Sequence, residues 1–141
     1  MTGVFETNGE TQTADIGRAL ASELQPGAIV LISGDLGAGK TAFVRGMAAG
    51  LGIDPQVVCS PTFSLVHEYR GGRVRLQHVD LYRLETPEVE GLGLDELANG
   101  EVITAVEWPD RLPRSLGPAT AVHIAHGDGD RRTIRIERQD D

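Results

Sequence analysis

The stretch SGDLGAGKTAF, residues 33–43, carries the clearest structural signal in this chain of 141 residues. Residues 34–41 match the pattern G-x-x-x-x-G-K-[ST], which binds phosphate when it lies between a strand and a helix. Residues 28–32 (AIVLI) are apolar throughout, as is typical of a strand buried on both faces of a parallel sheet. A helix over residues 40–50 is expected to follow. The order of strand, glycine-rich loop and helix therefore predicts a phosphate-binding loop.

Each residue type in this loop has a physical role. Glycines 34, 37 and 39 let the backbone curl until successive N–H groups point at phosphate oxygens. The N-terminus of the following helix favours negative charge at the same place. Lys40 reaches the terminal phosphates, and the hydroxyl of Thr41 binds Mg²⁺. The alternative is a glycine-rich turn without a ligand, but the flanking strand and helix favour a nucleoside triphosphate.

The sequence favours ATP as that nucleotide. Guanine-binding proteins with this loop usually carry N-K-x-D, but neither asparagine of this chain, Asn8 or Asn99, is followed by lysine. The L-S-G-G-Q stretch of transporter ATPases is also absent from the sequence. A small-molecule kinase needs a lid and an acceptor pocket, for which 141 residues leave little chain. A small-molecule kinase is therefore the weaker alternative to an ATPase.

Length and charge limit the other function classes. A chain of 141 residues is expected to form a single domain over residues 1–141. The net charge of −8 repels a phosphate backbone, which argues against general nucleic-acid binding. Cys59 is the only cysteine, the N-terminus does not resemble a signal peptide, and no apolar run approaches the roughly 20 residues of a membrane helix. We therefore expect a cytoplasmic protein without a membrane association.

The pattern along the chain predicts an α/β fold of three layers, with a mostly parallel central sheet and antiparallel additions. Besides the elements already named, we expect a helix over 11–24, a hairpin around the glycine pair 71–72, an interrupted helical region over 87–98 and a loop over 109–118. Alternation in the hairpin's second arm, residues 73–79, predicts one solvent-facing side. Further strands are expected over 102–106, 121–125 and 133–137.

Hydrolysis also needs a carboxylate near the metal, at the end of a strand beside the phosphate-binding loop. Asp80 and Glu107 both follow predicted strands. The strand before Glu107 is apolar on both faces, so we expect it at the centre of the sheet and assign Glu107 to the metal. Asp80 then fits a role in binding or activating water, and the alternative for Asp80 is a turn cap after its strand.

Four further segments give the chain a family resemblance. They are SPTFSLV (60–66), DLYRL (80–84), GLDE (93–96) and EWPDRL (107–112), and they follow the phosphate-binding loop in this order. Together they closely resemble the TsaE family over residues 10–136. The resemblance implies a protein that binds ATP and Mg²⁺ and hydrolyses ATP slowly alone. It also implies work with the TsaD–TsaB complex, which transfers threonylcarbamoyl to adenosine 37 of tRNA. In that family the ATPase supports turnover of the complex, and tRNA is contacted indirectly.

The resemblance also implies roles for individual residues. Lys40, Asp80 and Thr62 are the expected catalytic residues, and Thr41 and Glu107 the expected metal ligands. The nucleotide is expected to contact Glu10, Thr11, Leu36, Gly37, Ala38, Gly39, Lys40, Thr41, Trp108 and Arg131.

Three of these roles have alternatives. Thr62 is equally compatible with a turn after a proline. Trp108 is equally compatible with packing at the edge of the core. The neighbouring Arg132 could replace Arg131 beside the base.

The four histidines lack the spacing of a zinc site and are expected to be ordinary strand and loop residues.

Overall fold

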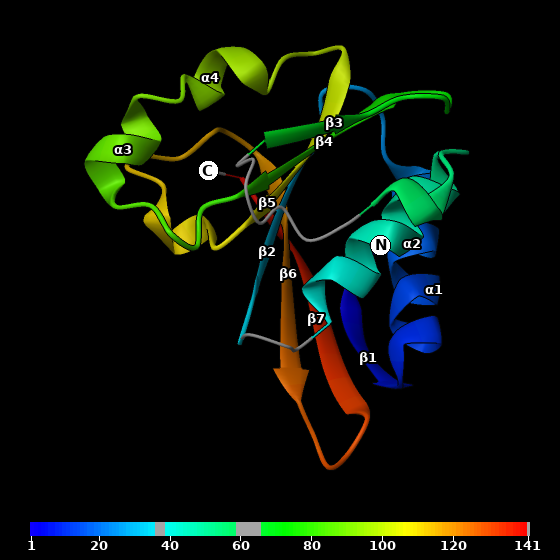
Figure 1. Cartoon of the computed structure of the whole chain (residues 1–141). Helices are drawn as coiled ribbons and strands as arrows, with labels where there is room; N and C mark the ends of the chain where they lie inside the picture. The colour runs from blue at the N-terminus through cyan, green and yellow to red at the C-terminus, as the bar shows by residue number, and fades with distance from the viewer. Residues whose placement is uncertain (36–38, 59–65, 141) are drawn as a thin grey trace.

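In the computed structural model, which describes residues 1–35, 39–58 and 66–140, seven strands form one mixed sheet (Figure 1). The strand order across it is β1-β7-β6-β2-β5-β4-β3. The strands are β1 (Gly3–Asn8), β2 (Ile29–Gly34), β3 (Val66–Tyr69), β4 (Arg75–Asp80), β5 (Val102–Glu107), β6 (Ala119–His126) and β7 (Arg131–Gln139). The helices are α1 (Glu10–Glu23), α2 (Lys40–Gly50), α3 (Thr86–Glu90) and α4 (Leu94–Leu97), with 3-10 turns at Pro55–Val57 and Pro109–Arg111.

The centre of the sheet is parallel. β2 pairs in parallel with β5 on one side and with β6 on the other, and β4 pairs in parallel with β5. The pairs β3–β4, β6–β7 and β1–β7 are antiparallel. Every residue of β5 is buried, as expected for a central strand with both faces covered. The α/β class, the parallel centre and the position of β5 beside β2 are therefore confirmed.

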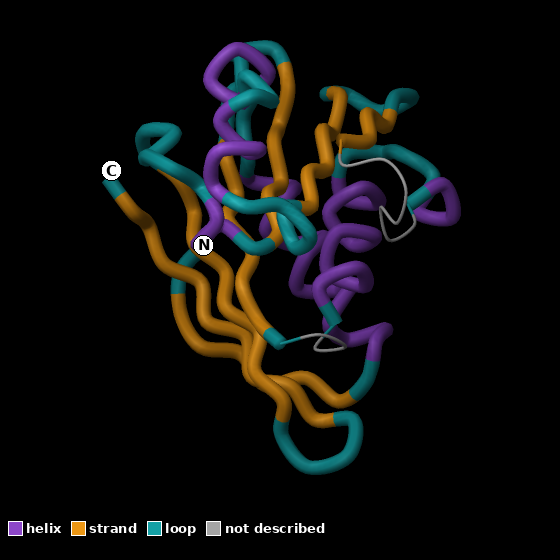
Figure 2. The backbone as a smooth tube through the Cα atoms, turned by 60° about the vertical axis from the view of Figure 1, so that its left-hand side comes forward, coloured by secondary structure: helices purple, strands orange, loops and turns teal. Residues whose placement is uncertain are grey.

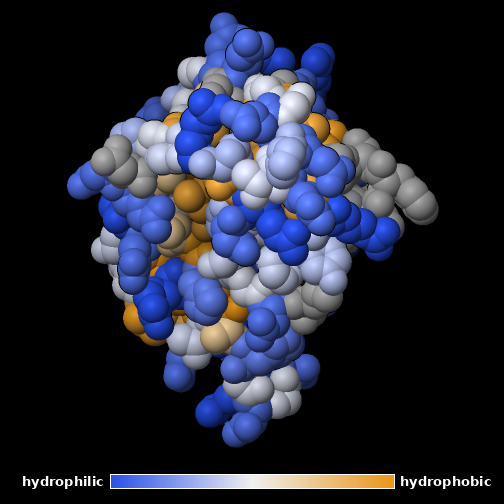
Figure 3. Space-filling view, turned by 90° about the vertical axis from the view of Figure 1, so that its left-hand side faces the viewer, coloured by the Kyte–Doolittle hydropathy of each residue, from blue (hydrophilic) through white to orange (hydrophobic). Residues whose placement is uncertain are grey.

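The two faces of the sheet are covered unequally. α1 and α2 lie together on one face, and their apolar residues form the larger core with residues such as Val30, Leu76 and Ile103 (Figures 1 and 2). On the other face, a smaller cluster includes Val106 of β5 and Val89 of α3. α3 and α4 are short, and the surface on their side is mostly hydrophilic, with an apolar area in a hollow (Figure 3).

The close packing of α1 on α2 depends on small residues. A Cβ atom added at Gly46 of α2 would lie 1.9 Å from the carbonyl oxygen of Ala14 of α1. No side chain fits in that space, so the two helix backbones approach each other directly. This contact fixes α2 against the rest of the fold, and α2 begins at Lys40.

Several expectations from the sequence need correction. The strand β1 was not predicted, because its segment GVFETN mixes apolar and polar residues and has only one buried position. The helix α1 begins at Glu10, one residue earlier than expected. A 3-10 turn, Pro109–Arg111, lies in the segment expected to be a loop only.

The solvent-facing side predicted for the second hairpin arm is also wrong at Gln77, which is 4% exposed. The side chain of Gln77 is buried beside β5, where its Nε2 lies at hydrogen-bond distance from Oγ1 of Thr104, whereas Arg73 is exposed and Arg75 is partly exposed as expected. Within the described part of the chain, no helix has both the length and the apolar character required to cross a bilayer.

Candidate functional site

Two carboxylates lie side by side at the C-terminal ends of β4 and β5. In the sheet register Asp80 is paired with Glu107, and Glu107 is paired with Ile32 of β2. The chain leaves β2 at Gly34 and re-enters regular structure at Lys40, the first residue of α2. The end of a parallel sheet where such loops meet is the usual place for a ligand in α/β folds. The topology thus brings both predicted carboxylates to the edge of the sheet where β2 ends at Gly34, the first glycine of the motif.

Lys40 is buried at this edge of the sheet. Lys40 is only 5% exposed, and its Nζ donates a hydrogen bond to the carbonyl oxygen of Gly34 at 2.6 Å. The same ammonium group lies 4.0 Å from the centroid of the Trp108 ring, within range of a cation–π interaction. Burial lowers the pKa of Lys40, and the charges of Glu107 and Asp80 oppose that shift.

The described ends of the glycine-rich loop have restricted geometry. A Cβ at Gly34 would lie 2.4 Å from the carbonyl oxygen of Ile124 in β6, so the neighbouring strand excludes any side chain there. Gly39 adopts a left-handed conformation with φ of 106° immediately before α2, which glycine tolerates without strain. Leu36, Gly37 and Ala38, the predicted phosphate-binding residues between them, lie outside the described residues.

Glu107 is held by His78, which was expected from the sequence to be an ordinary strand or loop residue. Glu107 is 4% exposed and His78 is fully buried. Nε2 of His78 lies 2.5 Å from Oε2 of Glu107, a short hydrogen bond between buried groups. His78 precedes Asp80 by two residues, so strand alternation places both on the same face. That spacing is the signal in the sequence that could have indicated a role for His78.

Asp80 has a different environment. It is partly exposed, and its Oδ1 accepts a hydrogen bond from the backbone N–H of Tyr82 at 2.9 Å. The turn cap considered as an alternative for Asp80 is therefore present. Burial raises the pKa of this carboxyl group, with the hydrogen bond from Tyr82 opposing the shift and the charge of Glu107 adding to it.

Trp108 links the two strand ends. Its backbone is left-handed, with φ of 60°, the single non-glycine residue of the described chain with positive φ. Its ring packs against that of Tyr82 at a centroid distance of 5.0 Å. Trp108 also borders the smaller apolar cluster. Packing at the edge of the core is thus confirmed for this residue, and its predicted nucleotide contact stays a prediction. Residues held in this rare conformation are concentrated at functional sites.

The residues predicted to contact the base fall around three cavities. Glu10 lines a cavity of about 350 Å³ together with Gly39 and Arg132. Arg131 lines a different cavity, of about 360 Å³, which Arg132 borders as well. The structure therefore brings Glu10 and Arg132 to the end of the glycine-rich loop.

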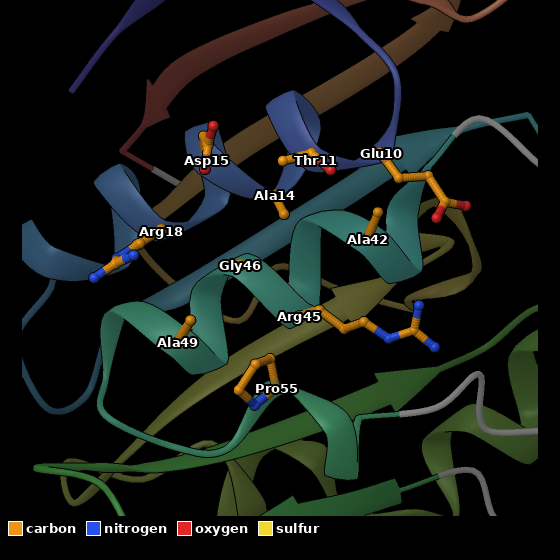
Figure 4. Close-up of a pocket in the computed structure, with 10 residues that line it drawn as sticks. All are labelled: Glu10, Thr11, Ala14, Asp15, Arg18, Ala42, Arg45, Gly46, Ala49 and Pro55. Carbon is orange, nitrogen blue, oxygen red and sulfur yellow. The ribbon is translucent and has the colours of Figure 1, made fainter.

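Thr11 belongs to a third cavity, a groove of about 310 Å³ between α1 and α2 that Glu10 also borders (Figure 4). In Figure 4 the short side chains of Ala14, Ala42 and Ala49 lie along this groove, between the two helices. The groove is therefore a consequence of the small residues that let the helices approach. It is lined by neither of the paired carboxylates.

The oxygen atoms at the strand ends suit Mg²⁺. Thr41 is the second residue of α2 and is partly buried, and Asp80 and Glu107, which are paired in the sheet register, supply two carboxylates near its neighbour Lys40. No cluster of three or more His, Cys, Asp or Glu residues arranged for a metal occurs within the described ranges. Mg²⁺ is usually bound by one or two carboxylates together with phosphate oxygens and water, so this donor set fits it. Thr62, the other predicted catalytic residue, lies outside the described residues.

The solved structure titled crystal structure of Bacillus subtilis YdiB has the same fold. It superposes with a TM-score of 0.78 and 30% sequence identity, covering 100% of this chain and 87% of that one.

Three relatives named tRNA threonylcarbamoyladenosine biosynthesis protein TsaE match as well. The Nostoc sp. protein is 41% identical over 140 residues, covering 96% of this chain and 85% of its own length. The Bacillus subtilis protein is 42% identical over 112 residues, covering 79% of this chain and 70% of its own length. The Synechocystis sp. protein is 54% identical over 102 residues, covering 70% of this chain and 64% of its own length.

The family model described as threonylcarbamoyl adenosine biosynthesis protein TsaE matches residues 7–136, nearly the whole chain. This match agrees with the glycine-rich loop and with the sequence segments that follow it. The chain belongs to the TsaE family of P-loop proteins, which takes part in the biosynthesis of threonylcarbamoyladenosine in tRNA.

Proposed function

We propose that this chain binds ATP with Mg²⁺, hydrolyses it, and works with TsaD and TsaB in tRNA threonylcarbamoylation. In this proposal it supports repeated turnover of the TsaD–TsaB complex and does not transfer the threonylcarbamoyl group itself. The observation that carries the proposal is the buried ammonium group of Lys40. It lies between the end of β2 and Trp108, beside two neighbouring carboxylates.

Phosphate binding is supported by the surroundings of Lys40. A lysine is rarely buried unless its charge has partners, and the hydrogen-bond acceptor at Lys40 is a backbone carbonyl. A phosphate oxygen would be a stronger acceptor, because its negative charge attracts the ammonium group in addition to accepting its hydrogen bond. The N-terminus of the eleven-residue helix α2 lies at the same place and favours an anion.

The carboxylates need a counter-charge if a triphosphate is bound. Thr41 and Glu107 would hold Mg²⁺, which when bound supplies positive charge to the phosphate oxygens. Asp80, with one oxygen engaged by Tyr82, would use its other oxygen to orient or deprotonate the attacking water. In this proposal Glu10 and Arg132 would contact the base or ribose, which is supported by the cavity that both line together with Gly39.

The acidic chain is better suited to a protein partner than to tRNA itself. A net charge of −8 disfavours contact with a phosphate backbone, so in this proposal TsaD and TsaB contact the tRNA. The cytoplasm, where tRNA is modified, is the proposed location.

Reconstitution with purified TsaD, TsaB and tRNA tests the proposal. We expect that adding the wild-type chain with Mg²⁺ and ATP increases the number of modified tRNA molecules per TsaD–TsaB complex. Glu107→Gln should abolish the increase. The matched control is Glu101→Gln, in the exposed residue that precedes β5, and should behave as wild type.

Two outcomes contradict parts of the proposal. If Glu107→Gln binds ATP, hydrolyses none and still supports turnover, nucleotide occupancy suffices and the chain acts as an adaptor. If adding the chain to cell extract with labelled ATP labels a metabolite that the extract alone does not label, the chain is a kinase. Release of free phosphate and ADP alone agrees with the ATPase.

A further inference from the structure

The contact between His78 and Glu107 is a direct consequence of the sheet register. His78 is paired with Ala105, and Asp80 with Glu107. Because side chains alternate along each strand, His78 and Glu107 lie on the same face of the sheet, which is the face covered by α1 and α2. Their side chains meet through Nε2 and Oε2 at 2.5 Å, although they are 29 residues apart in sequence.

The surroundings of the two ring nitrogens of His78 assign the ring proton to Nε2. Nδ1 of this ring is buried and has no hydrogen-bond partner among the described residues. A buried N–H without an acceptor is rare and costs about 1–3 kcal/mol, so Nδ1 is expected to carry no proton. The ring then donates from Nε2, and Glu107 accepts as a carboxylate. This tautomer follows from the arrangement of donors and acceptors.

Aromatic neighbours restrict the orientation of the His78 ring. The ring of Tyr69, in the adjacent strand β3, lies 6.2 Å from it between centroids. The hydroxyl of Tyr69 is in turn 3.1 Å from Nδ1 of His67. Tyr69 is 7% exposed and His78 is fully buried, so neither ring has room to rotate freely. His78 is thus a rigid donor.

We propose that His78 is a positioning residue for the metal ligand Glu107, and this inference rests on the function proposed above. By engaging Oε2, His78 fixes the rotation of the carboxylate and leaves Oε1 for Mg²⁺. Groups that hydrogen-bond to a metal ligand orient it, and their removal typically lowers metal affinity about 10- to 100-fold. His78 therefore contributes to metal binding without touching the metal.

Two substitutions of His78 separate this role from general packing. The side-chain nitrogen of glutamine can take the place of Nε2 and donate to Glu107. Asparagine is shorter, and its nitrogen corresponds to Nδ1, which does not face Glu107. Both replacements are neutral amides in the same buried position, so they differ mainly in reach. The control is His123→Asn, at an exposed residue of β6.

Metal affinity is the main measurement. We expect His78→Asn to weaken Mn²⁺ binding about tenfold or more in the complex with a non-hydrolysable ATP analogue, measured by electron paramagnetic resonance. Binding of the same analogue in EDTA should be unchanged, which a misfolded variant would not show. His78→Gln should recover most of the affinity. Equal Mn²⁺ affinity in wild type and His78→Asn would overturn the proposal.

A second measurement needs neither metal nor nucleotide and covers the case in which His78→Asn does not fold. In the wild-type chain, long-range ¹H–¹⁵N spectra of labelled histidine should show His78 protonated at Nε2. A ring protonated at Nδ1 alone contradicts the assigned hydrogen bond.

The two proposals fail in different ways. Absence of Mn²⁺–nucleotide binding by the wild type would refute the proposed function. Wild-type binding together with an unaffected His78→Asn variant would refute only the role of His78.

Discussion

Asp80 closes β4 and Glu107 closes β5, and the two residues are direct neighbours in the sheet. Their surroundings nevertheless differ. Glu107 is nearly fully buried and accepts a hydrogen bond from a side chain, whereas Asp80 is partly exposed and accepts one from its own backbone turn. Each is followed closely by an aromatic residue, Trp108 or Tyr82, and these rings pack together. Identical positions on adjacent strands thus give one fixed carboxylate and one that solvent can reach.

The largest expected effect is on hydrolysis. If Asp80 orients or deprotonates the attacking water and Glu107 binds the metal, Asp80→Asn should lower kcat about 100-fold or more while Mn²⁺ affinity stays nearly unchanged. Glu107→Gln should lower both. Steady-state phosphate release and Mn²⁺ titration of each variant measure this difference. Equal losses of metal affinity in the two variants would show that the carboxylates share one role.

Lys40 faces both carboxylates, and its removal tests the phosphate side of the site. A hydrogen bond to a charged group contributes about 1.5–3 kcal/mol, so Lys40→Ala should weaken ATP binding roughly 10- to 150-fold. Calorimetric titration with ATP measures this loss of affinity. The control is Arg18→Ala, at an exposed residue of α1, which should bind ATP as the wild type does. Unchanged affinity would place the triphosphate elsewhere.

Stability should change in opposite directions at the two strand ends. Glu107→Ala leaves the N–H of His78 buried without an acceptor, so the free energy of unfolding should fall by about 1–3 kcal/mol. Asp80→Asn removes a carboxylate that is destabilised by partial burial, so this variant should be at least as stable as wild type at neutral pH. Urea unfolding of both variants measures the contrast. A loss of stability in Asp80→Asn equal to that in Glu107→Ala would contradict it.

The pH dependence follows from the raised pKa of Asp80. A carboxyl group whose pKa is higher in the folded state stabilises the fold below its unfolded pKa, here near 3.8, and this contribution is lost as pH rises through the folded value. Asp80→Asn cannot titrate, so it should gain stability relative to wild type across that window and keep a constant difference above it. Urea unfolding at a series of pH values tests this; a difference that shrinks with rising pH would contradict it.

The smallest expected effect concerns the link between the two strand ends. Trp108→Gly and Trp108→Ala both remove the ring contacts, but only alanine must adopt the left-handed backbone at a cost of roughly 1 kcal/mol. We therefore expect the glycine variant to be more stable than the alanine variant by about that amount in chemical unfolding. Equal stability would indicate that the backbone relaxes once the ring is removed.

Part of this architecture could be predicted from short-range patterns. The apolar run at residues 28–32, the glycine-rich loop and the helix from Lys40 follow one another in sequence, and the structure describes strand and helix in those places. The burial of β5 could be predicted because an apolar strand without polar alternation fits the centre of a parallel sheet. β1 could not, since its pairing with β7 joins opposite ends of the chain and leaves little pattern in its own residues.

The sequence by itself determined the glycine-rich motif between a strand and a helix, the parallel centre of the sheet and the two candidate carboxylates, because local spacing and hydropathy encode strands, turns and helix starts. Only the tertiary structure decided how the carboxylates differ. The partner of Glu107 is His78, 29 residues away, and the ring over Lys40 is Trp108, 68 residues away. Such contacts arise from strand register and from the packing of whole layers, and no local pattern contains that information.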